Sequence, residues 1–287
     1  MGSPPIAEIR AMGTRKCWGV PFLAVALCAA PALAADLPTE KPPPEPVVIP
    51  ALPSTWHYEA ALLGYAANLE ANVGVRNLPT VPVSADIFQI LEHLEGIIPV
   101  SAVAYSDNFI VGANLFWLRV GVGGNFGPAA GAFTGANAGV VLNETFATAY
   151  GGVRIPTPAP DWLVWGILGA RVFNVNATVN LQVPVTGFNR STSDGKTWAD
   201  PIVGVTMRHR IDDKWFLLFE TDAGGYSGSA TAEVYGSVGY KWNEHLTSRV
   251  GGRVLYAYRQ GPAESGNGSF RFQETIWGPL VDTVFTF

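Results

Sequence analysis

The chain has 287 residues, and 18 lysine and arginine residues against 23 aspartate and glutamate residues give it a net charge of −5. Only 14% of the residues are charged, compared with about 25% in an average soluble domain. An acidic balance argues against a nucleic-acid-binding protein, two cysteines exclude a scaffold held by disulfides, and a hydrophobic fraction of 48% excludes a disordered chain.

The first 54 residues predict an export signal followed by a tether. In residues 1–34, two basic residues precede an apolar run that ends in Ala32-Leu33-Ala34, the small residues that a signal peptidase recognises. Met12 is an alternative start, because it gives a signal of more typical length. Prolines interrupt the apolar run, which is too short to cross a bilayer as a helix. The proline-rich residues 35–54 predict an extended periplasmic tether.

From residue 55 to residue 287 the sequence is typical of β-strands. Apolar and polar residues alternate over segments of roughly ten residues, separated by turn residues. In the clearest segment, 230–242, Val234 and Val238 share one face and Thr231 and Glu233 share the other. Ten strands are predicted in this way: 56–66, 97–106, 109–120, 143–155, 162–175, 198–210, 213–223, 229–242, 246–259 and 268–287.

The connections between these strands alternate in length. Short turns are predicted at 106–108, 156–161, 211–213 and 243–245, and long connections at 67–96, 121–142, 176–197 and 260–267, with 224–228 as a short exception. Outer-membrane barrels have short periplasmic turns and longer outer loops, whereas a soluble sandwich has no reason to sort its loops. We therefore predict an all-β protein, a transmembrane antiparallel up-and-down β-barrel of ten strands, with eight strands as the alternative.

The first long connection contains one predicted helix. In residues 84–95, the apolar side chains of Ile87, Ile90, Leu91 and Leu94 recur at helical spacing, and Ser84 or Asp86 can cap the N-terminus. The sequence is equally compatible with a lid in the barrel mouth and with a helix on the rim.

Aromatic residues predict where the chain meets the bilayer surface. Trp56, Trp162, Trp215 and Trp242 all lie close to the proposed short turns. Tryptophan favours the bilayer interface, so these four residues predict an aromatic girdle at the periplasmic end. At the end of the chain, Val281, Phe285 and Phe287 share one face of the last strand. This ending resembles the signal by which the outer-membrane insertion machinery recognises its substrates.

Several motifs extend the resemblance. The segments Trp198-Ala199-Asp200-Pro201, Ile211-Asp212-Asp213-Lys214-Trp215, Asp222-Ala223-Gly224-Gly225-Tyr226 and Trp277-Gly278-Pro279 resemble those of small porin-like outer-membrane β-barrels of Gram-negative bacteria. The start at Ala34-Ala35-Asp36-Leu37-Pro38 resembles mature ends of alphaproteobacterial outer-membrane proteins. The resemblance is good over 198–287 and looser over 56–155. It implies a fold and an outer-membrane location, and it implies little about function, since most of these barrels are uncharacterised.

If the apolar face of each strand meets lipid, a large set of polar side chains faces the interior. An arginine or lysine that faces lipid at mid-bilayer destabilises a barrel by about 2–4 kcal/mol. The charged face of each strand is therefore expected to point inward. These side chains either line a charge-selective pore or fill a narrow barrel with a closed network of ion pairs. The predicted inward set is Arg171, Asp200, Arg208, Arg210, Glu220, Asp222, Glu233, Lys241, Arg249, Arg253 and Arg259.

We assign no catalytic residue, cofactor or metal ligand. Of the four histidines, only His93 is predicted near the outer rim, where an outer-membrane hydrolase would work, and no nucleophile and base can be paired with it. No Gly-x-Ser-x-Gly motif is present, and no two histidines have the spacing of metal ligands. The glycine-rich segment Gly121–Gly127 precedes no helix, so we predict an outer loop there, not a phosphate site.

Two functional hypotheses remain. The first is passive passage of small solutes through a narrow polar lumen, and the second is a structural or surface-interaction barrel with a closed lumen. An outer-membrane hydrolase is a remote alternative. The expected partners are outer-membrane lipid and lipopolysaccharide, with the barrel-insertion machinery during biogenesis and no nucleic acid.

Overall fold

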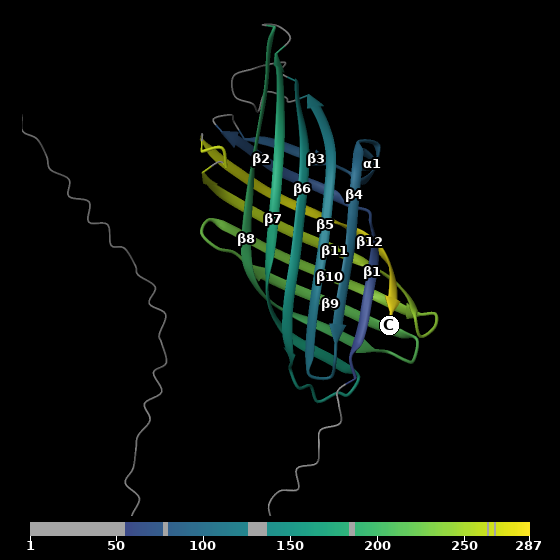
Figure 1. Cartoon of the computed structure of the whole chain (residues 1–287). Coiled ribbons are helices and arrows are strands. Elements are labelled where there is room, and N and C mark those ends of the chain that lie inside the picture. The colour runs from purple at the N-terminus through teal and green to yellow at the C-terminus, as the bar shows by residue number, and fades with distance from the viewer. Residues whose placement is uncertain (1–54, 77–79, 126–136, 184–186, 263, 267) are drawn as a thin grey trace, which may run out of the picture. The chain divides into compact units, whose positions relative to one another are not determined.

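The computed structural model describes residues 55–76, 80–125, 137–183, 187–262, 264–266 and 268–287 (Figure 1). The predicted signal peptide and tether lie outside the described residues. The described part contains the strands β1 (His57–Tyr65), β2 (Asn68–Arg76), β3 (Val81–Ala85), β4 (Leu94–Tyr105), β5 (Phe109–Asn125), β6 (Asn137–Arg154), β7 (Trp162–Val183), β8 (Phe188–Arg210), β9 (Trp215–Gly224), β10 (Ser229–Lys241), β11 (Leu246–Pro262) and β12 (Ser269–Thr286), and the helix α1 (Ile87–Glu92).

Ten of these strands close into a barrel. All pairs are antiparallel, and the sheet runs in the order β1-β4-β5-β6-β7-β8-β9-β10-β11-β12-β2-β3. The additional pairing of β1 with β12, from Glu59 opposite Thr286 to Tyr65 opposite Leu280, closes the barrel. The prediction of an all-β antiparallel barrel with ten strands is confirmed, and the alternative of eight strands is wrong.

The strands β2 and β3 were not predicted. β1 pairs with the C-terminal half of β12 and β2 with its N-terminal half, so the chain follows β12 along its whole length. At the junction, the Ala66 backbone N–H donates to the Pro279 carbonyl oxygen at 3.0 Å. A Cβ atom on Gly278 would lie 2.1 Å from the Ala66 carbonyl oxygen, so glycine is required where the chain passes. β3 then pairs with β2 alone.

The short turns lie at one end of the barrel, as predicted, and connect β4 to β5, β6 to β7, β8 to β9 and β10 to β11 (Figure 1). At the other end, the prediction of a long loop at 176–197 is wrong, and the one at 121–142 is wrong for 121–125 and 137–142, which are strand, whereas 126–136 lie outside the described residues. β7 has 22 residues and β8 has 23, and only 184–187 separate them. Residues 121–125 belong to β5, so most of the glycine-rich segment is strand as well.

The physical reason for this error is a reversal of polarity along single strands. Near the turns, Leu168 and Val172 of β7 face outward and are exposed, whereas Arg171 faces inward and is fully buried. Further along β7, Phe173 and Val175 face inward and are fully buried, whereas Asn174 and Asn176 are exposed. The period of two continues, but the two faces exchange character, so a search for outward apolar residues ends at Val172.

The same reversal divides the whole barrel into two sections. On β12, Trp277 and Val281 are exposed and Asp282 is buried, whereas beyond Trp277 the buried residues include Phe270 and Phe272. We call the part from the short turns to the level of Val172 and Trp277 the proximal section, and the part beyond it the distal section. The proximal section is apolar outside and contains most of the buried charges inside, together with two apolar clusters. The distal section is polar outside and mainly apolar inside.

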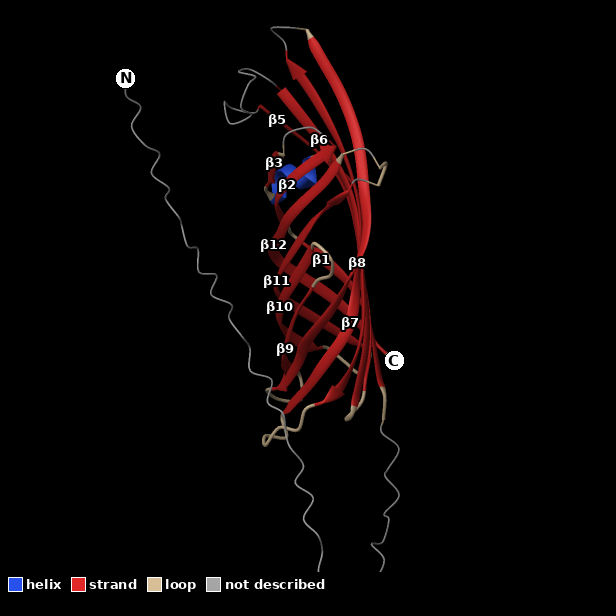
Figure 2. Ribbon diagram, turned by 90° about the vertical axis from the view of Figure 1, so that its left-hand side faces the viewer, coloured by secondary structure: helices blue, strands red, loops and turns tan. Residues whose placement is uncertain are grey.

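The distal section contains the main hydrophobic core. β2 lies close to β7 and β8 across the interior, so the walls of the barrel pack on each other as two layers (Figure 2). The core includes Leu69 and Val73 of β2, Phe116 of β5, Phe146 of β6 and Phe272 of β12. Packing of this kind is typical of a soluble β-sandwich.

The predicted helix is present as α1, between β3 and β4. Its N-cap is Asp86, whose side chain accepts a hydrogen bond from the Gln89 backbone N–H at 2.9 Å, and the Gln89 side chain accepts one from the Asp86 N–H at 3.1 Å. Ile90 is buried in the distal core, whereas Phe88 is 78% exposed. The helix therefore packs against β2, β3 and β5 with one side chain in the core. Among the described residues, no helix is long and apolar enough to cross a bilayer.

Candidate functional site

A buried arginine is the centre of the proximal interior. The guanidinium of Arg171 donates to Asp222 Oδ2 at 2.7 Å and to Glu233 Oε2 at 2.6 Å. It also donates to the hydroxyl oxygens of Thr148 and Thr231, both at 2.9 Å. Arg253 Nη2 donates to the same Glu233 oxygen at 3.0 Å. Four strands thus supply two arginines and two carboxylates to one hydrogen-bonded cluster, which we call the Arg171 cluster.

A second cluster lies closer to the short turns. Arg208 Nη1 donates to Glu59 Oε1 at 2.7 Å, and its guanidinium lies 4.0 Å from the centre of the Phe216 ring. Arg249 forms an ion pair with Asp282 at 3.2 Å. Because Glu59 belongs to β1 and Asp282 to β12, this cluster spans the closing seam of the barrel.

These two clusters share the proximal interior with two apolar clusters, one around Trp165 and one around Phe216. Between the two ion-pair clusters lies a cavity of about 30 Å3, lined by Glu220 together with Glu233, Tyr235, Arg249 and Arg253. A single water molecule occupies about 30 Å3 in the liquid, so this cavity has room for very few. The geometry there is that of an ion-pair core and not of a wide aqueous channel.

The other predicted lumen residues lie outside the two clusters. Asp200 is fully buried and accepts hydrogen bonds from Trp198 Nε1 at 3.2 Å and from the Ser229 hydroxyl. Arg210 is exposed at the turn end and donates to Asp161 at 3.1 Å. Arg259 donates to the Ser227 carbonyl oxygen at 3.1 Å in the β9–β10 connection. Arg210 therefore lies at the turn end, whereas Arg259 lies at the opposite end of the short strands β9 and β10, beside the middle of β8.

The turn end has an open polar pocket of about 430 Å3. Lys241 and Arg210 line it together with Asp161 and Glu244, so charges of both signs surround it. In the adjoining turn, hydrogen bonds from the backbone N–H groups of Trp215 and Lys214 lower the pKa of the Asp212 carboxyl. The pocket ends inward at the ion pair of Glu59 and Arg208.

Sequence reasoning missed several interior residues. Glu59 and Asp282 alternate correctly with outward apolar neighbours, so the period of two in β1 and β12 was the signal that could have found them. Thr148 and Thr231 carry no charge, and only the register between strands shows that they reach Arg171.

Two glutamates lie next to each other within the distal core. Glu144 of β6 and Glu274 of β12 are 0% and 1% exposed, and their carboxyl groups are neighbours. None of their four carboxyl oxygens has a hydrogen-bond partner among the described residues. A carboxylate oxygen can only accept a hydrogen bond, so a hydrogen bond between the two groups would require a proton on one of them.

Aromatic rings of the distal core close the interior around this pair. The rings of Phe116 and Phe146 stack with 4.7 Å between their centroids, and those of Phe173 and Trp198 with 4.9 Å. Phe272 lies 6.0 Å from Trp198, which connects β12 to the opposite layer. A polar solute moving through the barrel would have to displace these rings.

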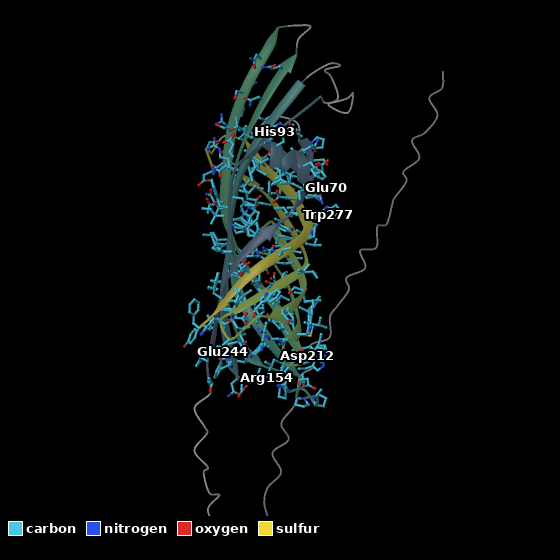
Figure 3. The ribbon with its side chains drawn as sticks, turned by 90° about the vertical axis from the view of Figure 1, so that its right-hand side faces the viewer. Glu70, His93, Arg154, Asp212, Glu244 and Trp277 are labelled. Carbon is cyan, nitrogen blue, oxygen red and sulfur yellow. The ribbon has the colours of Figure 1, made fainter. Side chains whose placement is uncertain are left out.

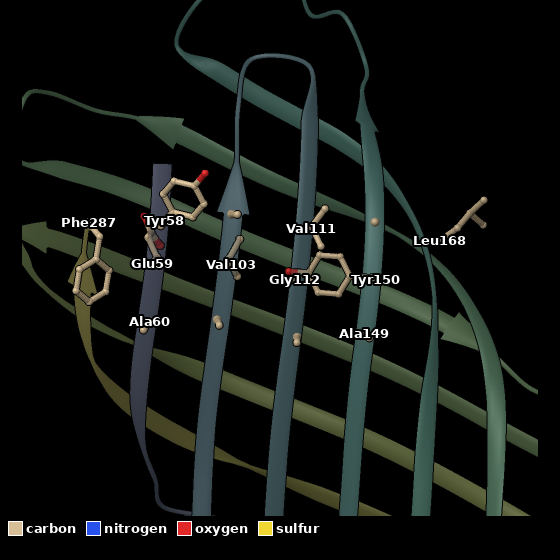
Figure 4. Close-up of a pocket in the computed structure, with 14 residues that line it drawn as sticks. Tyr58, Glu59, Ala60, Val103, Val111, Gly112, Ala149, Tyr150, Leu168 and Phe287 are labelled. Carbon is tan, nitrogen blue, oxygen red and sulfur yellow. The ribbon is translucent and has the colours of Figure 1, made fainter. Parts of the chain in front are cut away.

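The outer surface of the proximal section carries a shallow groove of about 740 Å3 (Figure 4). It crosses β1, β4, β5, β6 and β7, and Tyr58, Val111, Leu168 and Phe287 surround it. Alanines such as Ala60 and Ala149 form its floor. The groove is apolar and lies on the face predicted to meet lipid.

The four predicted girdle residues lie at the turn end. Trp56 precedes β1, Trp162 and Trp215 begin β7 and β9, and Trp242 follows β10. All four are exposed. Their assignment to a bilayer interface remains a prediction.

The histidines are not gathered into a site. His93, beside α1, lies far along the barrel from Asp212 and Glu244 in the turns (Figure 3). Its Nδ1 contacts the Gln89 carbonyl oxygen at 3.0 Å, while His57 stacks on Tyr105 and His209 on Trp162. Within the described ranges, no three histidine, cysteine, aspartate or glutamate side chains are grouped to hold a metal ion.

No protein-family model and no curated protein matches the chain. Among solved structures, the attachment invasion locus protein Ail of Yersinia pestis is 8% identical, with 81% of this chain and 98% of Ail covered and a TM-score of 0.31. Neisserial surface protein A is 12% identical, with 79% and 95% covered and a TM-score of 0.27. The transport unit of the autotransporter AIDA-I from Escherichia coli is 6% identical, with 83% and 91% covered and a TM-score of 0.38. These TM-scores are too low to transfer a function.

Proposed function

We propose that the protein is an integral outer-membrane β-barrel with a closed interior, which presents a folded β-sandwich outside the membrane for interactions at the cell surface. The reversal of polarity between the two sections carries this proposal. A soluble protein has no reason to cover one half of its surface with apolar side chains and the other half with polar ones. A bilayer that surrounds only the proximal section provides that reason.

The length of the apolar surface supports a bilayer. The outward apolar side chains of β7 lie between Trp162 and Val172, which is the length of a transmembrane β-strand, about 9–11 residues. On β12 they lie between Phe285 and Trp277. The short turns and the predicted girdle support an orientation with the turn end in the periplasm and the distal section outside.

The interior supports a closed barrel more than a pore. Passive passage of small solutes requires a continuous polar path, whereas the Arg171 cluster and the distal core lie in series along the interior. The small cavity between the two ion-pair clusters does not provide such a path. A surface-interaction role is therefore the better supported of the two hypotheses.

Location and orientation can be tested with single cysteines in living cells. Cys17 and Cys28 are replaced by serine, and Asn180→Cys in the distal section is compared with Glu244→Cys in a short turn. A membrane-impermeant maleimide is expected to label the cysteine at 180 in intact cells and the one at 244 only after the outer membrane is permeabilised. Labelling of both in intact cells, or the reverse order, would overturn the proposed orientation.

A further inference from the structure

The outward face of β6, β7 and β8 in the distal section lacks charge altogether. Its side chains carry amide or hydroxyl groups, with only Gly139, Val141 and Gly195 as exceptions. We call this surface the neutral face. Its polar members are Asn143, Thr145, Asn174, Asn176, Thr178, Asn180, Gln182, Asn189, Ser191, Ser193 and Thr197.

The charged residues of the same strands point the other way. Asp194 faces the opposite layer, where it accepts a hydrogen bond from Arg76 Nε of β2 at 3.1 Å. The outward side of that opposite layer carries Glu70 and Arg271, as an ordinary solvated sheet does. Solubility alone favours mixed charges on an exposed sheet, so it does not explain the neutral face.

Hydrogen bonds orient two neighbouring amide groups of the neutral face. Asn176 Nδ2 donates to Asn174 Oδ1 at 2.9 Å, and Asn174 Nδ2 donates to the Thr197 hydroxyl at 2.7 Å. A Cβ atom on Gly195 would lie 2.3 Å from Asn176 Oδ1, so glycine leaves room for this side chain. Cross-strand register places Thr178 opposite Ser193 and Asn180 opposite Ser191. The result is an ordered array of donors and acceptors.

On the β5 side this array is bordered by an aromatic ring and by Arg119, which lies opposite Asn143 and is neutralised by an exposed ion pair with Glu95. Trp117 of β5 donates from Nε1 to Asn143 Oδ1 at 2.9 Å. An indole held by its polar edge offers a flat apolar surface. Amides and hydroxyls beside an aromatic ring match the hydroxyl groups and apolar faces of sugar rings, because each amide and each hydroxyl can both donate and accept.

We propose that the neutral face binds the uncharged polysaccharide of glycolipids in the outer leaflet. The absence of charge favours a partner without charge, since burying an unpaired ion against a neutral glycan would cost free energy. The same strands present Leu168 and Val203 to the lipid side just below. The neutral face continues this lipid-facing surface away from the bilayer. It therefore lies where the saccharide of a glycolipid emerges from the bilayer. This inference rests on the proposed outer-membrane function.

The test uses the full chain reconstituted in lipid nanodiscs. A fluorophore on Ser193→Cys, in the background without Cys17 and Cys28, reports on the neutral face. The probes are smooth lipopolysaccharide purified from the bacterium that carries the gene, the polysaccharide released from it, and rough lipopolysaccharide that lacks the polysaccharide. Smooth lipopolysaccharide and the released polysaccharide are expected to shift the fluorescence with saturation, and rough lipopolysaccharide is not.

Two variants test the chemistry of the face. The triple change Asn174→Leu, Asn176→Leu and Thr178→Val removes hydrogen-bonding groups at nearly constant shape. The double change Asn176→Asp and Asn180→Asp keeps the shape and adds charge. Each is expected to weaken binding of the released polysaccharide at least tenfold. Migration on unheated gels shows whether a variant is folded.

The matched control lies on the opposite layer of the distal section. Gln273→Leu with Thr275→Val removes outward polar groups there and is expected to leave binding unchanged. The inference is overturned if the control weakens binding as much as the triple change, if wild-type protein binds dextran sulfate more tightly than the neutral polysaccharide, or if it binds no polysaccharide.

Other outcomes separate the remaining explanations. Self-association of wild-type protein that the triple change abolishes, without binding of polysaccharide, would make a second copy of this chain the occupant and overturn the inference. Failure of the protein to insert into lipid would instead contradict the proposed function itself. Insertion without saccharide binding would contradict only this inference.

Discussion

At the scale of single residues, the stability of the proximal section depends on charges that have no access to water. Arg171 is fully buried and forms hydrogen bonds with two carboxylates and two hydroxyls. A buried ion-pair cluster adds little stability compared with an apolar core. Removing one member nevertheless destabilises the protein strongly, because it leaves the other buried charges unpaired. The ion pairs of the interior are thus more informative about tolerance to mutation than about net stability.

Replacing the central arginine is expected to destabilise the barrel strongly. In Arg171→Met, Asp222 loses its ion-pair partner and Glu233 keeps only Arg253, which should cost about 3–5 kcal/mol. Urea-induced unfolding from lipid vesicles measures this loss. Arg210→Met is the matched control, because its ion pair with Asp161 is exposed and should be worth no more than about 1 kcal/mol. Equal losses of unfolding free energy in the two variants would show that the buried ion pairs of Arg171 contribute no more than the exposed ion pair of Arg210.

The glutamate pair has a distinct expected response. In Glu144→Gln the amide donates to Glu274 without a shared proton, so the free energy of unfolding should fall by no more than about 0.5 kcal/mol. In Glu144→Ala the buried Glu274 carboxyl has no partner, which should cost about 1–3 kcal/mol. The same urea unfolding distinguishes them. If glutamine were as harmful as alanine, the hydrogen bond between the carboxyl groups would be absent.

At the scale of elements, β7 shows what periodicity predicts and where it fails. Alternation located the ten barrel strands because outward apolar residues are frequent in the proximal section. The distal parts of β7 and β8 and the whole of β2 also alternate, with Leu69 and Val73 on the buried face of β2. Loops are predicted in these segments only because the apolar face of every strand is required to point outward, toward lipid. Without that requirement, the alternation of apolar and polar residues predicts strands in these segments.

The interior partners could not be predicted in the same way. Period two assigned Arg171 and Glu233 to the inside, but the pair is separated by 62 residues in the chain. Its contact depends on how the ten strands are staggered around the barrel, and staggering is set by cross-strand pairing that a single sequence does not specify. The pairing of Glu144 with Glu274 across the interior has the same origin.

A charge scan along the outward face of β7 tests the division into two sections. Leu168→Lys adds a charge to the apolar band and should lower the free energy of unfolding from vesicles by about 2–4 kcal/mol. Thr178→Lys, ten positions further along the same face, should change it by no more than about 0.5 kcal/mol. Folding titrations in urea compare the two. Similar losses at both positions would contradict a boundary between them.

At the scale of the whole molecule, the two sections have different tasks in the proposed function. The proximal section meets lipid on the outside and contains the buried ion pairs, so it serves as an anchor. The distal section has an apolar core like that of a soluble sandwich, so it can hold a flat polar surface such as the neutral face in one conformation. A barrel built only to conduct would need neither the distal core nor strands that continue beyond the bilayer.

Conductance decides between the closed barrel and the pore. Because the Arg171 cluster and the distal core lie in series, loss of one leaves the other in place. Purified wild-type protein in planar bilayers is therefore expected to show no current steps above background. The triple change Phe146→Ala, Phe173→Ala and Phe272→Ala, which opens only the distal core, should be equally silent if its unheated gel migration shows a folded barrel. Discrete steps in the wild type whose ion selectivity shifts in Arg249→Gln or Arg253→Gln would overturn the closed interior, because those side chains would then line a path for ions.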